Sequence, residues 1–449
     1  MRKVLDRLPR LSGRSLYLMV LVVMMMLYDF SGPVFRVPMV ILVLPWGCGV
    51  AYAALQTYRG KLGLRNWLLV ATSALLIVAS IRSGDLGQMT LYALGGEVVC
   101  LLGAGIVPEG TDTETLRREL LAFAWTMILF MLPLLLLSTL SVFLGHAFRL
   151  GTGIMGIQHD GVVTSRVYIV AHPDIGGRRA EMCILFAIYA LTHTRKSWQR
   201  VLLGATIVLS MMVIAHSQTR SCSLTLGMIF AALIYRAIYL RLHDKKWRML
   251  PALAGAAVTA VLTLAVLEAI YRVDVFVALR VMPAVAYAEE IGASRTLEMG
   301  LFNISESGRM PIWEMSLQYL KAHPGYLLLG TGAGDVTKQI AVDFPRAGEY
   351  AHLHNSFLEI LVRGGMPMLL CSLALLVSLI RPCYRMLIAP ETDGDKGAYI
   401  LPIIIGSMLA MTVSESMLFI RPTVINLIFF LALGRVAYAA GHKTIGQLR

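Results

Sequence analysis

The stretch Ala351 to Gly365, AHLHNSFLEILVRGG, places two histidines where a polar segment meets an apolar run. Histidine gains and loses a proton readily near neutral pH. His354 is therefore a candidate general base for a substrate presented at a membrane surface. His352 and Asn355 stand beside it and are candidate substrate-binding residues. The alternative is that His354 only precedes a helix, with Asn355 or Ser356 as the N-cap.

Three arginines are candidates for binding an anion: Arg220 in AHSQTRSCSLTLG, Arg309 in ISESGRMPIW and Arg166 in TSRVYIV. An arginine deep in a membrane helix costs about 2.5–3.5 kcal/mol and usually faces a cavity or a partner. The guanidinium group donates paired hydrogen bonds to phosphate oxygens and stays charged, which suits a diphosphate. The alternatives are snorkelling to head groups for Arg220, an ordinary solvated charge for Arg309, and a structural or lipid-facing role for Arg166.

The composition of the chain indicates whether these residues are positioned in water or in a membrane. Of 449 residues, 57% are hydrophobic and 15% are charged, and the mean hydropathy is +0.70. A soluble domain of this size is far less apolar, so the chain is predicted to lie in a membrane. The net charge of +13 comes from basic residues in short segments between apolar runs, as the positive-inside rule expects, and does not indicate nucleic-acid binding.

The apolar runs predict an all-α polytopic membrane protein with about twelve spanning helices, since each span needs roughly 20 apolar residues. The basic N-terminus resembles a signal peptide, but no small-residue cleavage site follows, so the first run is interpreted as an uncleaved span. The predicted spans are 15–30, 38–57, 66–82, 87–106, 119–145, 180–193, 201–217, 220–240, 249–271, 356–380, 398–415 and 421–440.

The basic loops predict that both termini are cytoplasmic. The chain then divides into helices one to nine (1–271), an outer lobe (272–354) and helices ten to twelve (355–449). Within the lobe, Pro311 to Leu320 (PIWEMSLQYL) has apolar residues near helical spacing, and proline suits a first helical turn. The lobe therefore contains at least one predicted helix, which begins just after Arg309.

The sequence predicts a site without metal or cofactor. The six cysteines are scattered, and no Cys, His, Asp or Glu residues have metal-ligand spacing. The glycine-rich stretch Gly330 to Asp335 lacks the Lys-Ser/Thr of a phosphate-binding P-loop, and it falls outside the cytoplasm in the predicted topology. We interpret it as a turn.

The order of these motifs resembles the superfamily of O-antigen ligases and polymerases. The ligases carry His, then Asn, Ser or Gln, nine residues, Gly, two residues, and Gly, Thr or Tyr. His354, Asn355 and Gly365 match this pattern, whereas Met368 departs from it. TRSCSLTLG resembles the Ser-Arg segment of the family, and SGRMPIWEMSLQYLKAHPGYLLLGTGAGD resembles its loop helix and glycine turn. The first half of the chain is similar only in hydropathy.

The resemblance implies a glycosyltransferase-C-like bundle acting at the periplasmic face of the bacterial inner membrane. The donor would be a glycan on undecaprenyl pyrophosphate, the acceptor lipid A–core oligosaccharide, and no metal or nucleotide would take part. His354 would be the base, and Arg220 and Arg309 would hold the diphosphate, with inversion at the anomeric carbon.

Other functions stay open at this stage. An O-antigen polymerase or a protein O-glycosyltransferase would use the same lipid-linked donor with another acceptor. A flippase for lipid-linked glycan is a further alternative from a different class. Its marks, inverted repeats and helices broken at the midplane, are absent from the sequence.

Overall fold

The computed structural model of the chain describes most of the predicted membrane segments and much of the outer lobe. The described residues are 12–29, 47, 51, 55, 64–84, 94–107, 110–144, 148–150, 153–160, 164–169, 173–217, 219–281, 309–350, 352–390, 396–412 and 423–442.

Helices dominate this part of the chain, which confirms a helical polytopic membrane protein. Among the described residues, seven helices are long and apolar enough to cross a membrane. They are α4 (Leu64–Ser83), α6 (Thr113–Leu144), α8 (Ser197–Ser217), α9 (Arg220–Arg241), α10 (Met249–Val281), α16 (Ser356–Ile388) and α18 (Val424–His442). Because lipid offers no hydrogen bonds to the backbone, apolar runs of this length satisfy their polar groups internally as helices.

Further helices complete the bundle: α2 (Gly13–Asp29), η1 (Val99–Ala104), α7 (Pro173–His193) and α17 (Ile400–Thr412). The predicted span 38–57 lies outside the described residues apart from 47, 51 and 55. Every other predicted span overlaps a described helix. The count of twelve crossings stays a prediction.

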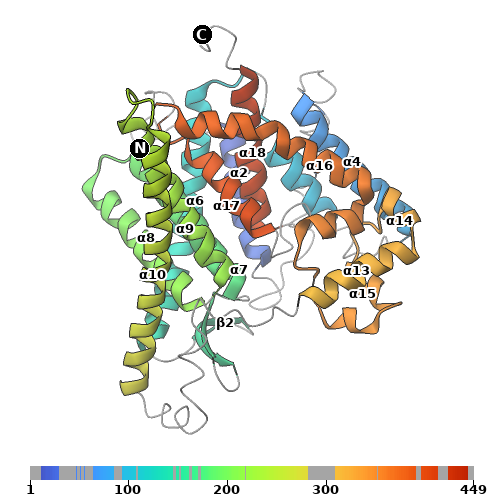
Figure 1. Cartoon of the computed structure of the whole chain (residues 1–449), viewed down its shortest axis with the longest axis horizontal. Coiled ribbons are helices and arrows are strands. Elements are labelled where there is room, and N and C mark those ends of the chain that lie inside the picture. Colours follow the sequence, from blue (N-terminus) through green and yellow to red (C-terminus); the bar gives the residue numbers. More distant parts are fainter. Residues whose placement is uncertain are drawn as a thin grey trace, which may run out of the picture.

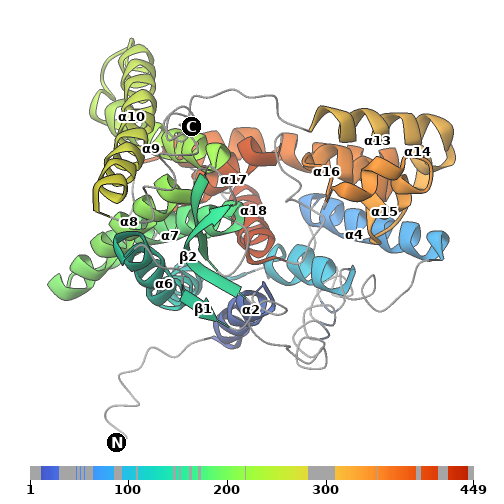
Figure 2. The same ribbon diagram turned by 90° about the horizontal axis from the view of Figure 1, so that it is seen from below.

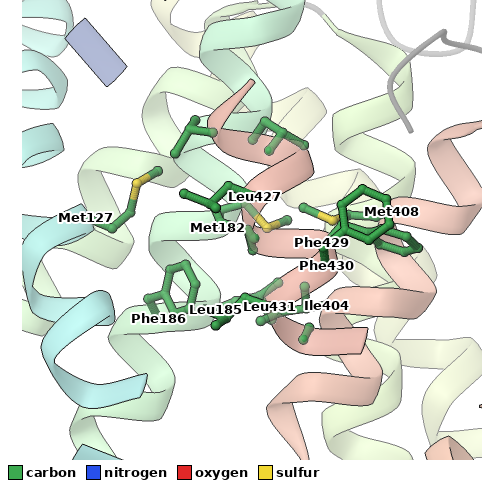
Figure 3. Close-up of a cluster of buried hydrophobic side chains, with 14 of the residues drawn as sticks. Met127, Met182, Leu185, Phe186, Ile404, Met408, Leu427, Phe429, Phe430 and Leu431 are labelled. Atoms are coloured by element: carbon green, nitrogen blue, oxygen red, sulfur yellow. The ribbon is translucent and has the colours of Figure 1, made fainter. Parts of the chain in front are cut away.

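The bundle core lies where α6, α7, α17 and α18 meet. Figure 3 shows Met127 of α6, Phe186 of α7, Met408 of α17 and Phe430 of α18 packed together, and all four side chains are buried. In contrast, α10 exposes a row of large apolar side chains, as expected of a lipid-facing surface. These include Leu250, Leu253, Val258, Val261, Leu262 and Val266.

Buried arginines tie the helix ends together. Glu119 of α6 accepts hydrogen bonds from Arg14 of α2 at 3.3 Å and from Arg435 of α18 at 3.1 Å. Arg236 of α9 donates to the carbonyls of Leu387 and Ala389, at the C-terminal end of α16. Such donors satisfy terminal carbonyls and favour the negative end of the helix dipole.

A small antiparallel sheet, which the sequence analysis did not predict, lies between α6 and α7 in the chain. It consists of β1 (Phe148–Leu150), β2 (Gly153–Asp160) and β3 (Thr164–Ile169) in the order β1-β2-β3. The sheet lies below the helices in Figure 1, and the far end of α10 lies in the same lower part of that view.

The structure confirms the predicted helix of the lobe as α13 (Met310–Ala322), with a proline in its first turn. We use "lobe" for residues 309–350, which continue through α14 (Gly325–Leu329), α15 (Val336–Ala341) and η2 (Pro345–Glu349). The lobe has its own apolar core, which includes Ile312, Leu320, Ile340, Leu353 and Val362. Burial raises the pKa of Tyr319, whose ring packs in this core.

The lobe lies beside α4 and α16. Figure 2 shows α13, α14 and α15 next to these two helices and on the opposite side of the molecule from α8, α9 and α10. The core of the lobe extends beyond the predicted domain boundary at residues 354–355, because Val362 of α16 belongs to it. The domain boundaries themselves stay a prediction.

Candidate active site

His354 lies in an unusual backbone conformation directly before α16. Its φ angle is +53°, in the left-handed region that few residues other than glycine adopt. Such a conformation costs on the order of 1–3 kcal/mol and persists only where the surroundings hold it. The backbone N–H of His354 donates to Nδ1 of His352 at 3.1 Å, and the two ring centroids are 3.9 Å apart. The predicted pair is therefore one compact unit.

Asn355 is the N-cap of α16, as one of the two sequence interpretations expected. Its side-chain carbonyl accepts a hydrogen bond from the Leu358 backbone N–H at 3.0 Å. This bond satisfies one of the amide groups left open at a helix start. A part for Asn355 in substrate binding stays a prediction.

Arg309 and the His354 segment are joined through Trp313. Arg309 precedes α13, and its carbonyl accepts from the Trp313 backbone N–H at 3.2 Å. The Trp313 indole N–H then donates to the carbonyl of Leu353 at 2.8 Å. Because Leu353 directly precedes His354, one tryptophan holds the backbone at Arg309 and the backbone before His354 in a defined relative position.

Arg220 is the exposed first residue of α9. A cation at this end of a helix is unfavourable, because the helix dipole places positive charge there. An anion bound at the same place would contact both the guanidinium group and the open helix end. Among the described residues, no hydrogen bond or ion pair joins Arg220 to Arg309 or His354, so Arg220 does not share the connection that Trp313 makes between the other two.

The turn that carries Arg220 packs against the start of α7. A Cβ atom at Gly177 would lie 3.0 Å from Oγ of Ser217 and 3.1 Å from Sγ of Cys222, so the two segments are in close contact. The neighbouring Arg178 and Arg179 are buried in the bundle. From the sequence, these two arginines are expected to be structural or lipid-facing rather than catalytic.

Arg166 is paired in register with Gln158 of β2, which places its backbone in the three-stranded sheet. Its side chain lies outside the described residues. Its proposed part in substrate binding stays a prediction.

Gly365, which matches the family pattern, and Met368, which departs from it, lie at the bend in α16. Gly365 has φ +73° inside α16, and a Cβ there would lie 2.8 Å from the Leu328 carbonyl carbon. The side chain of Met368 is buried and packs against Gly364. A Cβ atom at Gly364 would overlap the sulfur of Met368. Methionine therefore fills space beside the bend without disturbing the glycine that the bend requires.

The sequence analysis missed an ion pair between Glu359 and Arg363, one and two turns into α16. Glu359 Oε1 accepts from Arg363 Nε at 3.1 Å and from Nη2 at 2.9 Å, and both side chains are buried. The signal was present: opposite charges four residues apart, within the otherwise apolar run EILVRGG.

Taken together, these residues offer a histidine directly before α16, an arginine linked to it through Trp313, and a second arginine at the start of α9. Such a set suits proton removal from a hydroxyl beside a bound anion. Residues 205–373 match a protein-family model described as O-antigen ligase, and no curated protein matches the chain. The matched segment contains all the predicted site residues except Arg166.

Proposed function

We propose that the chain is an O-antigen ligase, in keeping with the family model that matches residues 205–373. It would move a completed glycan from undecaprenyl pyrophosphate to lipid A–core oligosaccharide at the outer face of the bacterial inner membrane. The observation that supports this proposal is the pair of hydrogen bonds that Trp313 donates to the carbonyls of Arg309 and Leu353, which we call the Trp313 bridge. It joins the segment of Arg309 to the residue before His354, at the N-terminal end of α16. A lipid-linked diphosphate and a membrane-bound acceptor would meet at this place.

In the proposed reaction, His354 removes the proton from an acceptor hydroxyl. The acceptor oxygen attacks the anomeric carbon of the first sugar, and the bond from that carbon to the pyrophosphate oxygen breaks. The pyrophosphate leaves with the bonding electrons, so no general acid is needed. A single displacement of this kind inverts the anomeric configuration.

Arg309 and Arg220 would hold the pyrophosphate before and during its departure. Two unit charges 4 Å apart attract by about 4 kcal/mol at the effective dielectric constant typical of a protein surface. Both substrates are confined to one leaflet, and holding them in line supplies further rate. Arg166, His352 and Asn355 are proposed to contact the glycan or the acceptor.

A polymerase or a protein O-glycosyltransferase would use the same site with another acceptor. The chain is therefore tested in proteoliposomes that contain a glycan on undecaprenyl pyrophosphate. Separate reactions receive lipid A–core, no further acceptor, or a Ser/Thr-containing peptide, and products are identified by mass spectrometry. Glycan on lipid A–core is expected. A longer lipid-linked glycan or a glycosylated peptide, with lipid A–core unmodified, would replace the ligase with the corresponding alternative.

A further inference from the structure

The glycine-rich turn 330–333 of the lobe is held between two membrane helices. On one side, the backbone N–H groups of Thr331 and Gly332 donate to the carbonyls of Val362 and Arg363, each at 2.8 Å. On the other side, the Ala333 N–H donates to Oγ of Ser80 in α4 at 2.9 Å. Three successive amides of one turn therefore bind to α16 and α4.

Arg363 completes this junction from within the helix. Besides its two bonds to Glu359, its Nη1 donates to the carbonyl of Ala333 at 2.9 Å. One planar guanidinium group thus joins the carboxylate of α16 to the backbone of the turn. Lysine cannot copy this pattern, because the three bonds use nitrogens in a fixed fork. We call Ser80, Ala333, Glu359 and Arg363 the clamp.

The backbones at the clamp approach too closely for side chains. A Cβ at Gly332 would lie 2.6 Å from Cα of Ser80, and one at Gly330 would overlap the carbonyl of Arg363. Both glycines have positive φ angles, +86° and +42°. The turn therefore fits α4 and α16 in one arrangement, which the buried ion pair then fixes.

Two members of the clamp, Glu359 and Arg363, lie on the same short segment as the proposed base. Glu359 is four residues after Asn355, the N-cap, and Arg363 is four residues further. The Trp313 bridge attaches the other side of the lobe to Leu353, directly before His354. The lobe is thus joined to the start of α16 at two places, before His354 and two turns after it.

We propose that Arg363 is a positioning residue: through the clamp it sets where the lobe, with Arg309, lies relative to His354. This inference rests on the proposed function, because the two positioned residues are its diphosphate ligand and its base. Arg363 contacts no substrate in this scheme. Its loss would misplace the reacting groups, and a displacement of about 1 Å can cost roughly 10²-fold in rate.

The chain offers a matched control. Arg435 also bonds a buried glutamate, Glu119, and a backbone carbonyl, that of Leu116, but these lie away from the lobe. Its side chain is 4% exposed, against 6% for Arg363. Arg363→Lys and Arg435→Lys therefore make the same chemical change in two similar buried ion pairs, of which only one belongs to the clamp.

The two variants are compared in full-length protein reconstituted with donor and acceptor, per amount of folded enzyme. Arg363→Lys is expected to lower kcat about 10- to 100-fold with little change in KM for the donor. Hydrogen exchange of peptides covering 330–333 and 352–358 should become faster. Arg435→Lys should leave kcat and both exchange rates close to wild type. Equal losses in the two variants, or an unchanged Arg363→Lys enzyme, would overturn the proposal.

A second pair of variants, with smaller changes, tests the proposal if Arg363→Lys does not fold. Ser80→Ala removes the acceptor of the Ala333 N–H and a bond that the Ser80 hydroxyl donates to Leu76 of its own helix. Thr72→Val is its control, because it removes only a bond of the second kind, from Thr72 to Leu68 in α4. Ser80→Ala should speed exchange at 330–333 and lower kcat, and Thr72→Val should do neither. The exchange measurement needs no turnover. Lack of transfer by the wild type would therefore count against the proposed function, whereas unchanged exchange would count against the clamp.

Discussion

The indole N–H of Trp313 donates to the carbonyl of Leu353 at 2.8 Å, and this bond is the direct link between the helix that follows Arg309 and the residue that precedes His354. Arg309 and His354 are far apart in sequence, and the helical turn after Arg309 is joined here to the backbone before His354 by one side chain. His354 has a strained φ angle, so its conformation depends on such contacts.

Trp313→Phe removes this donor and keeps an aromatic ring in the lobe core. The lost hydrogen bond should cost about 0.5–1.5 kcal/mol of stability. Glycan transfer per amount of folded protein should also fall, because His354 and Arg309 are no longer held in a defined relative position. Trp198→Phe, at an exposed position of α8, is the control for removing an indole. If the two variants had equal activity per amount of folded protein, the Trp313 bridge would not be needed for catalysis.

His354→Ala should lower turnover by about 10²–10⁴-fold, the usual contribution of a general base. The protein should still insert in the membrane and bind the donor, because the N-cap bond of Asn355 does not involve the histidine ring. Transfer and donor binding are measured on the same purified sample. Normal turnover in His354→Ala would transfer the role of base to His352, whose ring lies directly beside it.

Arg220→Lys and Arg309→Lys test geometry apart from charge. If each arginine binds the pyrophosphate through two parallel hydrogen bonds, lysine keeps the charge and loses the pairing, so both variants should be strongly impaired and alanine should be worse. Transfer and binding of undecaprenyl pyrophosphate are measured for each. Lysine variants with full activity would favour simple anchoring to head groups, since lysine reaches the interface equally well.

The sequence predicts much of the fold because an apolar run in lipid must satisfy its backbone hydrogen bonds internally, as a helix does. The spans that became α4, α6, α8, α9 and α10 could be recognised from length and hydropathy alone. The helix α13 could be predicted because its apolar spacing and N-terminal proline are local signals. The histidine pair and Asn355 could likewise be placed at a helix start from local sequence.

Contacts between distant segments could not be predicted in this way. The turn 330–333 has the composition of an ordinary loop, and nothing local indicates that it binds Ser80 of α4, some 250 residues earlier in the chain. The burial of Arg178 and Arg179 also depends on the neighbouring helices. The three-stranded sheet was missed because β1 has only three residues and because β2 contains glycines, which favour turns in a sequence-based interpretation.

The topology of the chain can be tested at two exposed lysines in a cysteine-free background. Lys321→Cys lies at the end of α13, and Lys245→Cys lies between α9 and α10. An impermeant maleimide should label position 321 in intact spheroplasts and position 245 only after permeabilisation, because the basic loops are predicted to be cytoplasmic. The opposite labelling pattern would place the candidate site in the cytoplasm, where the proposed acceptor is not presented for ligation.

Gly365→Ala tests whether the bend of α16 is required to seat the lobe. Gly365 has φ +73°, and an added Cβ would lie 2.8 Å from the carbonyl carbon and oxygen of Leu328 and 3.0 Å from the backbone nitrogen of Gly330. These neighbours are backbone atoms, which cannot move aside as a flexible side chain can. The strained φ angle alone should cost about 1–3 kcal/mol, and the lobe must also shift.

Gly204→Ala in α8 is the matched control, since a Cβ there meets no atom within 4 Å. Alanine is favoured over glycine inside a helix by roughly 0.5–1 kcal/mol, so this variant should be neutral or slightly more stable. Thermal unfolding in detergent and glycan transfer are measured for both. Gly365→Ala should unfold at a lower temperature and lose transfer, because the displaced lobe carries Arg309 away from His354. If Gly365→Ala instead matched Gly204→Ala in both measurements, the contact between the bend and the lobe would not be what positions the two residues.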